Sequence, residues 1–501
     1  MSFDIGKLPP EFLRLRDALP SELEVYLVGG AVRDLLLGLP IHDMDFVMSG
    51  GDVLAVSRQL AAELGFAFFP LDAERQVARL IAIRPDGSRL DMDFALLRGS
   101  SLKDDLGSRD FTINALAMSL HDPAKMFDPL GGAVDLLEKR LKPCSPSSFV
   151  DDPVRVLRGI RFVTAHAFKI DPEISQMMRQ AVDLLPRVSP ERLRDELFSI
   201  LSGSRAALAL RLMEKFGVLP HLLPELPSLK GVEQPPPHLL DVWEHTLDLL
   251  NELDALQSVL HTDYNPDDSA NLMLGLAVLR LGRYRNQLTS HLSEQLSVER
   301  TVRSLVYFAA LYHDVGKPQA RQLDESGKVR FLGHDEIGAQ LIRERGVALR
   351  LSNVEINRMV LMVRHHMRPI LLAKQTTSLT PRAIYRYFRD LGAAGVDVCL
   401  LSLADTLATY RHTISQEIWM RQLDVVRQLL EAWWERPQEQ VSPPALISGK
   451  DLLEHLRLPP GALIGRLLEA VREAQVTGEV TTREQALDWA KLKLEQLDDQ
   501  G

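Results

Sequence analysis

Two aspartates separated by one residue follow a glycine pair near the start of the chain. The stretch LVGGAVRDLLLGLPIHDMDF (27–46) has Gly29 and Gly30 after an apolar run, and Asp43 and Asp45 near its end. On a strand, residues i and i+2 point to the same face, so the two carboxylates would lie side by side. Such like charges repel unless a cation lies between them. Mg²⁺ binds carboxylates together with phosphate oxygens, and paired ions of this kind serve phosphoryl and nucleotidyl transfer.

The glycine pair is suited to bind a phosphate. It lies between a predicted strand (25–30) and a predicted helix (31–38), where small residues let the backbone approach an anion. The N-terminus of the helix favours negative charge, and Arg33 would neutralise more of it. The alternative is a tight turn followed by an exposed strand edge, without a ligand. The two features in one short stretch favour a nucleotide site, with Mg²⁺ held by Asp43 and Asp45.

Composition sets limits on the class of protein. The chain has 501 residues, 46% hydrophobic and 25% charged, which is typical of a globular protein of two to four domains. The net charge of −10 argues weakly against a nucleic-acid partner, although an acidic protein can carry a basic groove. Two cysteines exclude a disulfide framework and a cysteine zinc site. The first residues lack a signal-peptide pattern, and no apolar run is long enough for a membrane span. We therefore expect a cytoplasmic protein.

The pattern of secondary structure changes near residue 140. Before it, a second strand after residue 43, a helix over 53–65 and a hairpin over 78–97 with its turn at 85–87 indicate an α/β domain. After it, helical periodicity dominates, with predicted helices over 153–167, 172–184, 190–202 and 205–216. Proline-rich stretches at 233–238 and 441–449 mark boundaries. The prediction is an α/β head (1–140), a helical neck (141–232), a second helical domain (233–440) and a helical tail (441–501).

Four later motifs extend the first one. SRDFTINALAM (108–118), FDPLGGAVDLLEKRL (127–141), DDPVRVLRGIRF (151–162) and SPERLRDELFSIL (189–201) follow in order. With LVGGAVRDLLLGLPIHDMDF they resemble the motifs of the class II tRNA nucleotidyltransferase and bacterial poly(A) polymerase family, within the polymerase-β-like superfamily. One position departs from that family, because Asp151 stands where a glutamate is usual. The resemblance covers about residues 20–225 and implies a polymerase-β-like α/β head followed by all-helical domains.

The resemblance also implies roles for single residues. Arg109, Asp110 and Asn114 would bind the ribose and phosphates of a nucleotide. Asp152 and Arg155 would select the base, because C and A share an amino donor beside a ring acceptor, where G and U present a carbonyl. Taken without the family, Asp152 could be a helix N-cap and Arg155 a surface cation.

Two further residues belong to the predicted nucleotide site. Arg158 follows Arg155 at helical spacing, with RNA phosphate as an alternative ligand. Asp93, on the predicted hairpin with Asp91 on the same face, is our candidate for a third catalytic carboxylate. The segment ERQVARLIAI (74–83) lacks the Gly-Arg-Arg-Phe-type stretch expected of bacterial poly(A) polymerases, which favours a tRNA enzyme using CTP and ATP.

Histidines and aspartates form a second constellation between residues 245 and 405. Neutral imidazole and carboxylate ligands from several helices suit a divalent metal, although a single histidine is more often a surface or core residue. The ordered set resembles the HD metal-dependent phosphohydrolase domain, over about residues 238–435. By that resemblance one metal (Mg, Mn, Ni or similar) would be bound by His245, His313, Asp314 and Asp405, and a second metal or a phosphate by His334 and His366.

Two positions near this set are ambiguous. His365 and His366 are adjacent, so on a helix they point about 100° apart, and only one can join the set. We choose His366 from its spacing to Pro369. Lys317 could contact a phosphate or cap a helix end.

The helix predicted over PRAIYRYFRDLG (381–392) places Arg382, Arg386 and Arg389 along one face. This face could contact tRNA, or it could be the charged side of an ordinary amphipathic helix.

The sequence predicts a template-independent tRNA nucleotidyltransferase that adds C, A or both to a tRNA 3′ end and releases pyrophosphate. One alternative is an HD phosphohydrolase acting on RNA ends, whose head only binds RNA, and a second is a poly(A) polymerase. We expect a monomer or homodimer. Whether CCA, CC, the final A or poly(A) is added does not follow from these motifs.

Overall fold

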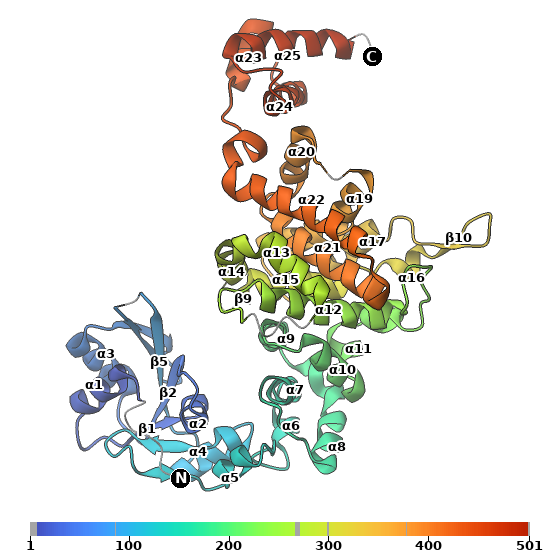
Figure 1. The fold of residues 1–501 in the computed structure, drawn as a ribbon. Helices are drawn as coiled ribbons and strands as arrows, with labels where there is room; N and C mark the ends of the chain where they lie inside the picture. Colours follow the sequence, from blue (N-terminus) through green and yellow to red (C-terminus); the bar gives the residue numbers. More distant parts are fainter. Residues whose placement is uncertain (1–7, 86, 266–270, 298–299, 377, 499–501) are drawn as a thin grey trace. The chain divides into compact units, whose positions relative to one another are not determined.

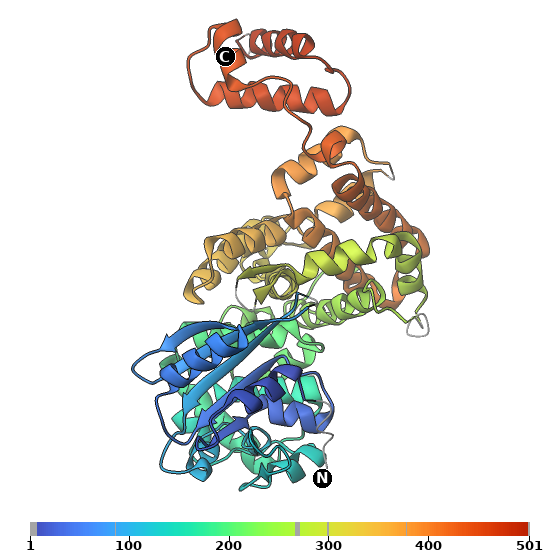
Figure 2. The same cartoon turned by 90° about the vertical axis from the view of Figure 1, so that its left-hand side faces the viewer.

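The computed structural model describes residues 8–85, 87–265, 271–297, 300–376 and 378–498. It forms two compact units, of which the first comprises Met1–Glu196 and Arg211–Leu222 and the second Leu197–Leu210 and Leu223–Gly501 (Figures 1 and 2). The boundary between the units falls inside a helix of the predicted neck, so the division of the chain into four domains stays a prediction. Asp86, in the predicted hairpin turn, lies outside the described residues.

The first unit is built on a mixed sheet with the strand order β3-β4-β5-β2-β1-β6-β7. Its strands are β1 (Val25–Val28), β2 (Asp43–Met48), β3 (Ala67–Asp72), β4 (Val77–Ile83), β5 (Arg89–Leu96), β6 (Ala117–Ser119) and β7 (Met126–Phe127). The predicted hairpin is confirmed as the antiparallel pair β4–β5. Strand β3 was not predicted. It is an edge strand that contains Pro70 and buries little, so it shows no alternating pattern.

One face of the sheet is covered by α1 (Pro10–Ala18), α2 (Gly30–Leu37) and α3 (Val53–Leu64), with α1 against α3 in Figures 1 and 2. Every second residue of β2 enters the core on this side, and Phe46 stacks on Phe94 of β5 with ring centroids 4.7 Å apart. Because side chains alternate along a strand, Asp43 and Asp45 are directed to the opposite face. The hydrophobic pattern thus places the carboxylates as predicted.

Helices carry the rest of the first unit. They are α4 (Leu102–Gly107), α5 (Gly132–Leu137), α6 (Ser148–Asp151), α7 (Arg155–His166), α8 (Pro172–Ala181), α9 (Pro190–Ser202, its last residues in the second unit), α10 (Ala206–Phe216, shared likewise) and α11 (Leu219–Leu222), with short 3-10 turns at Thr112–Asn114 and Val182–Arg187. The third motif supports the second, because Thr112 donates from Oγ1 to Asp135 at 2.8 Å. A side chain at Gly132 would meet the Thr112 carbonyl oxygen at 2.0 Å, so only glycine allows this packing.

The second unit is helical. A 3-10 turn (Leu226–Leu229) leads into it, and its larger helices are α12 (Val242–Val259), α15 (Val302–Tyr312), α17 (His334–Ala348), α18 (Asn353–His365), α21 (Ala394–Tyr410) and α22 (Gln416–Glu435). The shorter helices are α13 (Leu272–Leu281), α14 (Arg285–Ser293), α16 (Lys317–Ala320), α19 (Arg368–Gln375) and α20 (Pro381–Leu391), with 3-10 turns at Gly282–Tyr284 and Arg411–Thr413 and a π-turn at Pro437–Val441. There are also two small hairpins, β8 (Gln295–Ser297) with β9 (Arg300–Thr301) and β10 (Gln322–Leu323) with β11 (Val329–Arg330). Helix α15 is buried along its whole length, so the other helices pack around it.

A buried carboxylate joins three of these helices. Asp397 of α21 accepts hydrogen bonds from Arg358 of α18 at 2.6 Å and lies 2.6 Å from the Nε2 atom of His291 in α14. Burial alone would raise the pKa of Asp397, but His291 and Arg358 reverse the effect and lower it. The ion pair therefore stays charged inside the helical unit.

The C-terminal helices α23 (Gly449–Leu456), α24 (Ala462–Val476) and α25 (Arg483–Asp498) enclose a small core of their own (Figure 2, red). Three arginines of α20 face glutamates of this segment, and the ion pairs link Arg382 with Glu479, Arg386 with Glu473, and Arg389 with Glu469. In this structure the arginine face of α20 is therefore the charged side of an amphipathic helix that meets the tail.

Among the described residues, no single helix is both long and apolar enough to cross a membrane. The bent pair Pro381–Leu391 and Ala394–Thr413 passes that test by length and composition only.

Candidate functional site

Four carboxylates lie on the open face of the head sheet. Strands β2 and β5 run parallel, with Asp43 opposite Asp91 and Asp45 opposite Asp93. Arg79 of β4 pairs with Asp93 at 2.7 Å and with Asp91 at 3.0 Å, so the two acids of β5 are neutralised. In the described part of the chain, neither acid of β2 forms an ion pair. The face therefore leaves two adjacent negative charges, those of Asp43 and Asp45, without an ion-pair partner, although the charge of Arg109 offsets part of that at Asp45.

The pair on β2 has the properties of a cation site. Although Asp45 is exposed, the loss of water around its carboxylate and then the charge of Asp43 raise the pKa of Asp45 to about 6. A bound divalent cation would favour the ionised form and remove this cost. The two residues therefore fit Mg²⁺. Asp93 lies beside them as predicted, but both of its oxygens accept from Arg79, and its role as a third catalytic carboxylate stays a prediction.

The glycine turn lies beside these acids. Gly29 has φ +75°, and a Cβ atom there would lie 2.9 Å from Nη1 of Arg109 and 3.7 Å from Oδ2 of Asp45. Both the backbone conformation and the space therefore require glycine. Gly30 begins α2. Arg109 donates from Nε and Nη2 to Asp105, each at 3.1 Å, and its Nη1 remains beside the turn, where a phosphate would lie.

Four other predicted nucleotide-binding residues form one chain of hydrogen bonds. Arg33 donates to Asn114 at 2.7 Å, Asn114 donates to Asp110 at 3.0 Å, and Arg158 donates to the other oxygen of Asp110 at 2.7 Å. Burial alone would raise the pKa of Asp110, but the Arg158 guanidinium and the Asn114 amide reverse the effect and lower it. Asp110 is therefore an ionised buried anchor that positions the two arginines.

Asp152 has one oxygen held and one free. Its Oδ2 accepts from Arg192 at 2.6 Å, whereas its Oδ1 is buried and has no hydrogen-bond partner among the described residues. Asp152 does not cap α7, so the N-cap alternative is wrong. Arg155 is fixed by bonds to the Ser148 hydroxyl at 2.7 Å and to the Ser108 carbonyl at 2.8 Å. We did not predict the contact from Arg192, a residue of the fifth motif.

A cavity of about 410 Å³ connects these groups within the first unit. Among its lining residues are Asp45, Asp93, Arg98, Asp105, Arg109, Asp110, Asp152, Arg155, Arg158 and Arg192. Asp45 beside the glycine turn, Arg109 and Asp152 thus line one space. This is the arrangement needed to hold a nucleotide by its phosphates and by its base.

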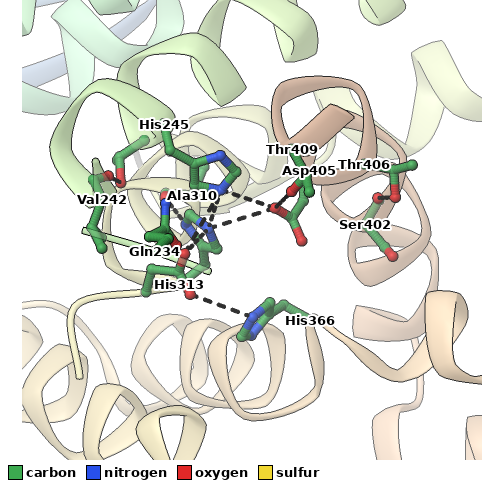
Figure 3. Close-up of polar contacts among 12 residues, drawn as sticks. Gln234, Val242, His245, Ala310, His313, His366, Ser402, Asp405, Thr406 and Thr409 are labelled. Carbon is green, nitrogen blue, oxygen red and sulfur yellow. Dashed lines mark hydrogen bonds and ion pairs between the residues drawn. The ribbon is translucent and has the colours of Figure 1, made fainter. Parts of the chain in front are cut away.

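The second constellation forms a buried cluster in the helical unit (Figure 3). Its members come from α12 (His245), the end of α15 (His313 and Asp314), the start of α17 (His334), the end of α18 (His366) and α21 (Asp405). Nε2 of His245 lies 3.0 Å from Asp405 and 3.7 Å from Asp314, and Nε2 of His313 lies 3.1 Å from Asp314. The other oxygen of Asp314 lies 3.4 Å from His334 and 3.9 Å from His366. Asp314 is thus shared by two groups of candidate ligands.

Backbone carbonyls orient three of the four imidazoles. The Nδ1 atoms of His313, His334 and His366 lie 2.7–2.8 Å from the carbonyl oxygens of Ala310, Phe331 and Val363, respectively. A carbonyl can only accept, so each Nδ1 carries a proton, and each ring in its neutral form presents the lone pair of Nε2 to the cluster. Nε2 of His334 is buried without a hydrogen-bond partner in the described chain. This donor set fits one or two divalent metals.

The charges in the cluster support the same conclusion. Burial would raise the pKa of Asp314, but His313 and Lys317 hold it well below its usual range. Burial, reinforced by His313, lowers the pKa of His366 to about 4, so this imidazole is neutral, as a metal ligand must be. Lys317 is buried and lies 2.6 Å from both Asp314 and Gln234, so its ammonium is part of the cluster.

Sequence reasoning missed one histidine beside the cluster. The ring of His238 meets that of His245 edge to face, with centroids 5.1 Å apart, and its Nδ1 is buried without a hydrogen-bond partner among the described residues. It follows the proline run at 233–238, which we used only as a boundary. His365 does not join the cluster, whereas its neighbour His366 does. A cavity of about 540 Å³ opens beside these groups, with Asp314, Lys317, His334, His366 and Asp405 in its wall.

Comparison with known proteins decides the family. Residues 25–142 match the family model "Poly A polymerase head domain", 167–229 the "Probable RNA and SrmB-binding site of polymerase A", 284–410 the "HD domain", and 397–490 a model of domain 2 of tRNA nucleotidyltransferases. The A-adding tRNA nucleotidyltransferase of Deinococcus radiodurans is 34% identical over 92% of this chain and 93% of its own length. The chain belongs to the tRNA nucleotidyltransferase family. The predicted family is therefore confirmed.

Other members of the tRNA nucleotidyltransferase family agree over most of the chain. The CC-adding tRNA nucleotidyltransferase of Thermus thermophilus is 31% identical over 95% of this chain and 93% of its own length. A solved CCA-adding enzyme with CTP matches 98% of this chain and 97% of its own at a TM-score of 0.58 and 21% identity. The Thermotoga maritima CCA-adding enzyme complexed with tRNA_CCA gives 0.55 and 21%, over 99% of this chain and all of its own. The structural matches confirm the predicted fold.

The position of Asp314 leads to a test of the metal centre. We expect the wild-type chain to bind two Co²⁺ ions at the histidine cluster, since imidazole suits such metals better than a carboxylate pair does. Asp314→Ala should lose both ions, whereas His334→Ala should lose only one. Visible absorption during Co²⁺ titration measures the stoichiometry. His365→Ala is the matched control and should keep both ions, while full occupancy in Asp314→Ala would refute the shared ligand.

Proposed function

We propose that this enzyme adds C, A or both from CTP and ATP to the 3′ end of tRNA that lacks part or all of its CCA end. The observation that carries the proposal is the cavity of about 410 Å³, which is lined by Asp45, Arg109, Asp152 and Arg155 together. Membership of the tRNA nucleotidyltransferase family supports the same substrates. The cavity is lined by residues whose chemistry suits a metal, phosphates and a base.

In this reaction the tRNA 3′-hydroxyl oxygen bonds to the α-phosphorus of the nucleotide, and the bond from that phosphorus to pyrophosphate breaks. Two Mg²⁺ ions held by Asp43 and Asp45, when bound, would activate the hydroxyl and stabilise the leaving pyrophosphate. Arg109 and the backbone at Gly29 and Gly30 would bind the phosphates. Because the chain fixes these groups in advance, it orients the nucleotide for attack.

Base selection would depend on Asp152 and Arg155. The buried Oδ1 of Asp152 can accept from the exocyclic amino group that C and A share, whereas G and U offer a carbonyl oxygen that would repel it. Arg192 holds the other oxygen at 2.6 Å and thereby fixes the orientation of the carboxylate. Arg155, anchored through Ser148, would donate to the ring acceptor. The protein alone can therefore reject G and U.

The paired aspartates provide the first test. We expect Asp43→Ala and Asp45→Ala each to lower the rate of nucleotide addition by more than about a hundredfold, because each removes a direct metal ligand. The assay offers tRNAs that end before CCA, after C and after CC, with CTP and ATP singly and together, and the products are sequenced. The matched control is Asp91→Ala, on the same sheet face but paired with Arg79.

The same assay defines the product. Addition of CC only, of A only, or of CCA would each support the proposal and fix the specificity. Undiminished addition by the Asp43 and Asp45 variants would refute it, and long oligo(A) products would identify a poly(A) polymerase instead.

The free oxygen of Asp152 gives a second test. Asp152→Asn replaces one acceptor by an amide donor, so kcat/KM for CTP and ATP should fall by about tenfold or more, and that for UTP and GTP should rise relative to them. Steady-state kinetics with the four nucleotides measures the change. Asp151→Asn, at the neighbouring exposed carboxylate, should leave the ratios unaltered. Equal ratios in Asp152→Asn and wild type would exclude base selection by this residue.

The histidine cluster supports a second candidate function. A buried set of four histidines and two aspartates beside a cavity of about 540 Å³ favours metal-dependent hydrolysis of phosphate esters at RNA ends, in addition to nucleotide transfer. Lys317, beside Asp314, supplies a positive charge for a phosphate. A purely structural role in holding tRNA is the alternative.

Hydrolysis is testable apart from nucleotide addition. With Ni²⁺, Mn²⁺ or Mg²⁺ present, we expect the enzyme to open an RNA 2′,3′-cyclic phosphate or release phosphate from its product, and His313→Ala to lose more than about a hundredfold of this activity. His313→Ala should retain nucleotide addition. Turnover that persists in His313→Ala, or none with any of the metals, would exclude this function. The cytoplasmic location and the monomeric or homodimeric state stay predictions.

A further inference from the structure

One arginine of the nucleotide cavity has no assigned role. Arg98 follows the end of β5 and lines the cavity of about 410 Å³. Its backbone is held firmly, because its N–H donates to Oδ1 of Asp105 at 3.0 Å and Gly99 makes a turn with φ +85°. A side chain at Gly99 would meet Cβ of Asp104 at 2.7 Å, so the turn packs closely against α4. The position of Arg98 is therefore fixed at the cavity.

The guanidinium of Arg98 differs from the others around it. Each of the remaining arginines of the cavity is bonded to protein: Arg109 to Asp105, Arg155 to Ser148 and Ser108, Arg158 to Asp110, and Arg192 to Asp152. The Arg98 side chain is exposed, and among the described residues it forms neither an ion pair nor a side-chain hydrogen bond. It is thus a cation available to an anion that enters the cavity.

Asp105 links Arg98 to the glycine turn. This carboxylate is almost fully buried, and its two oxygens have different partners. Oδ1 accepts from the backbone N–H of Arg98, and Oδ2 accepts from the guanidinium of Arg109, whose Nη1 lies beside Gly29. One buried anion therefore sets the spacing between the two arginines. A guanidinium binds phosphate through two parallel hydrogen bonds, which suits a chain of phosphates that extends from the glycine turn.

We infer that Arg98 binds the β- and γ-phosphates of the incoming nucleoside triphosphate and the pyrophosphate that leaves, and that Asp105 positions Arg98 and Arg109 for this task. The inference rests on the proposed nucleotide addition and extends it to the leaving group. Arg98 loses no protein partner when it binds phosphate, so its contact adds directly to affinity. The chemistry recognised is the polyphosphate, and the base does not contribute.

The experiment compares ligands that differ only in phosphates. Binding of CTP, CMP and inorganic pyrophosphate to the full chain with Mg²⁺ is measured by calorimetry. Arg98→Ala should weaken the binding of CTP and of pyrophosphate by about tenfold or more, because a charge-assisted hydrogen bond is lost. The affinity for CMP should stay unchanged. The CTP affinity of Arg98→Lys should lie between those of the wild-type chain and Arg98→Ala, since lysine keeps the positive charge. Arg75→Ala, an exposed arginine outside the cavity, is the matched control.

The role of Asp105 is tested by non-additivity. Asp105→Asn should also weaken the binding of CTP more than that of CMP. Adding Arg98→Ala to this variant should weaken CTP binding by a smaller factor than Arg98→Ala does in the wild-type chain. A merely structural role would weaken CTP and CMP equally. Because the Arg98 side chain is exposed, Arg98→Ala tests the inference even if Asp105→Asn fails to fold.

Four results would overturn the inference. Unchanged CTP binding in Arg98→Ala with a raised KM for tRNA would assign the residue to RNA phosphate instead. Equal losses of affinity for CTP and CMP would show that Arg98 does not bind the β- and γ-phosphates. CTP binding that is normal in every variant would leave nucleotide addition intact but refute the inference, whereas a wild-type chain that binds no CTP would refute both.

Discussion

Repulsion among four carboxylates on one sheet face is the constraint on which the head depends. The parallel register of β2 and β5 brings Asp43 beside Asp91 and Asp45 beside Asp93. Arg79 neutralises the β5 pair, so the remaining charge is confined to β2. That charge has to be met by a ligand cation, and a cation held there attracts the phosphates of a nucleotide. The glycine turn and Arg109 lie beside Asp45, where those phosphates would be placed.

In the histidine cluster of the helical unit, a buried acid is surrounded by positive or neutral groups instead of by other acids. Asp314 is surrounded by histidines and by Lys317, so its negative charge is shared rather than repelled. Carbonyl oxygens fix the tautomers of His313, His334 and His366 before any metal binds. Because the backbone holds these rings, the cluster is preorganised and its affinity does not depend on ordering flexible side chains. The two centres lie in different units, so we expect that each can be inactivated by itself.

The residue pattern within a single strand or helix predicts the features that depend only on the geometry of that element. The alternation in DMDFVM placed Asp43 and Asp45 on one face, and the helix predicted over 31–38 lies within one residue of α2 at each end. Contacts between distant segments do not show in such patterns. Arg192 reaches Asp152 across 40 residues, and Arg79 reaches Asp93 across 14. The second contact could have been predicted, because a hairpin with its turn at 85–87 places residue 79 opposite residue 93, which is the register that the structure has.

The choice between C and A cannot come from the donor and acceptor pattern at Asp152. Both bases present an amino group beside a ring acceptor, so a single carboxylate oxygen and a guanidinium accept either one. Their difference is size, since a purine is longer than a pyrimidine between the sugar and that edge. Under the proposed function the glycine turn would fix the phosphates at one end, and Asp152, which Arg192 holds in place, would fix the base at the other. Under the proposed function, the distance between these two anchors therefore determines which base fits, and a shift of the anchors relative to each other would be needed to accept both.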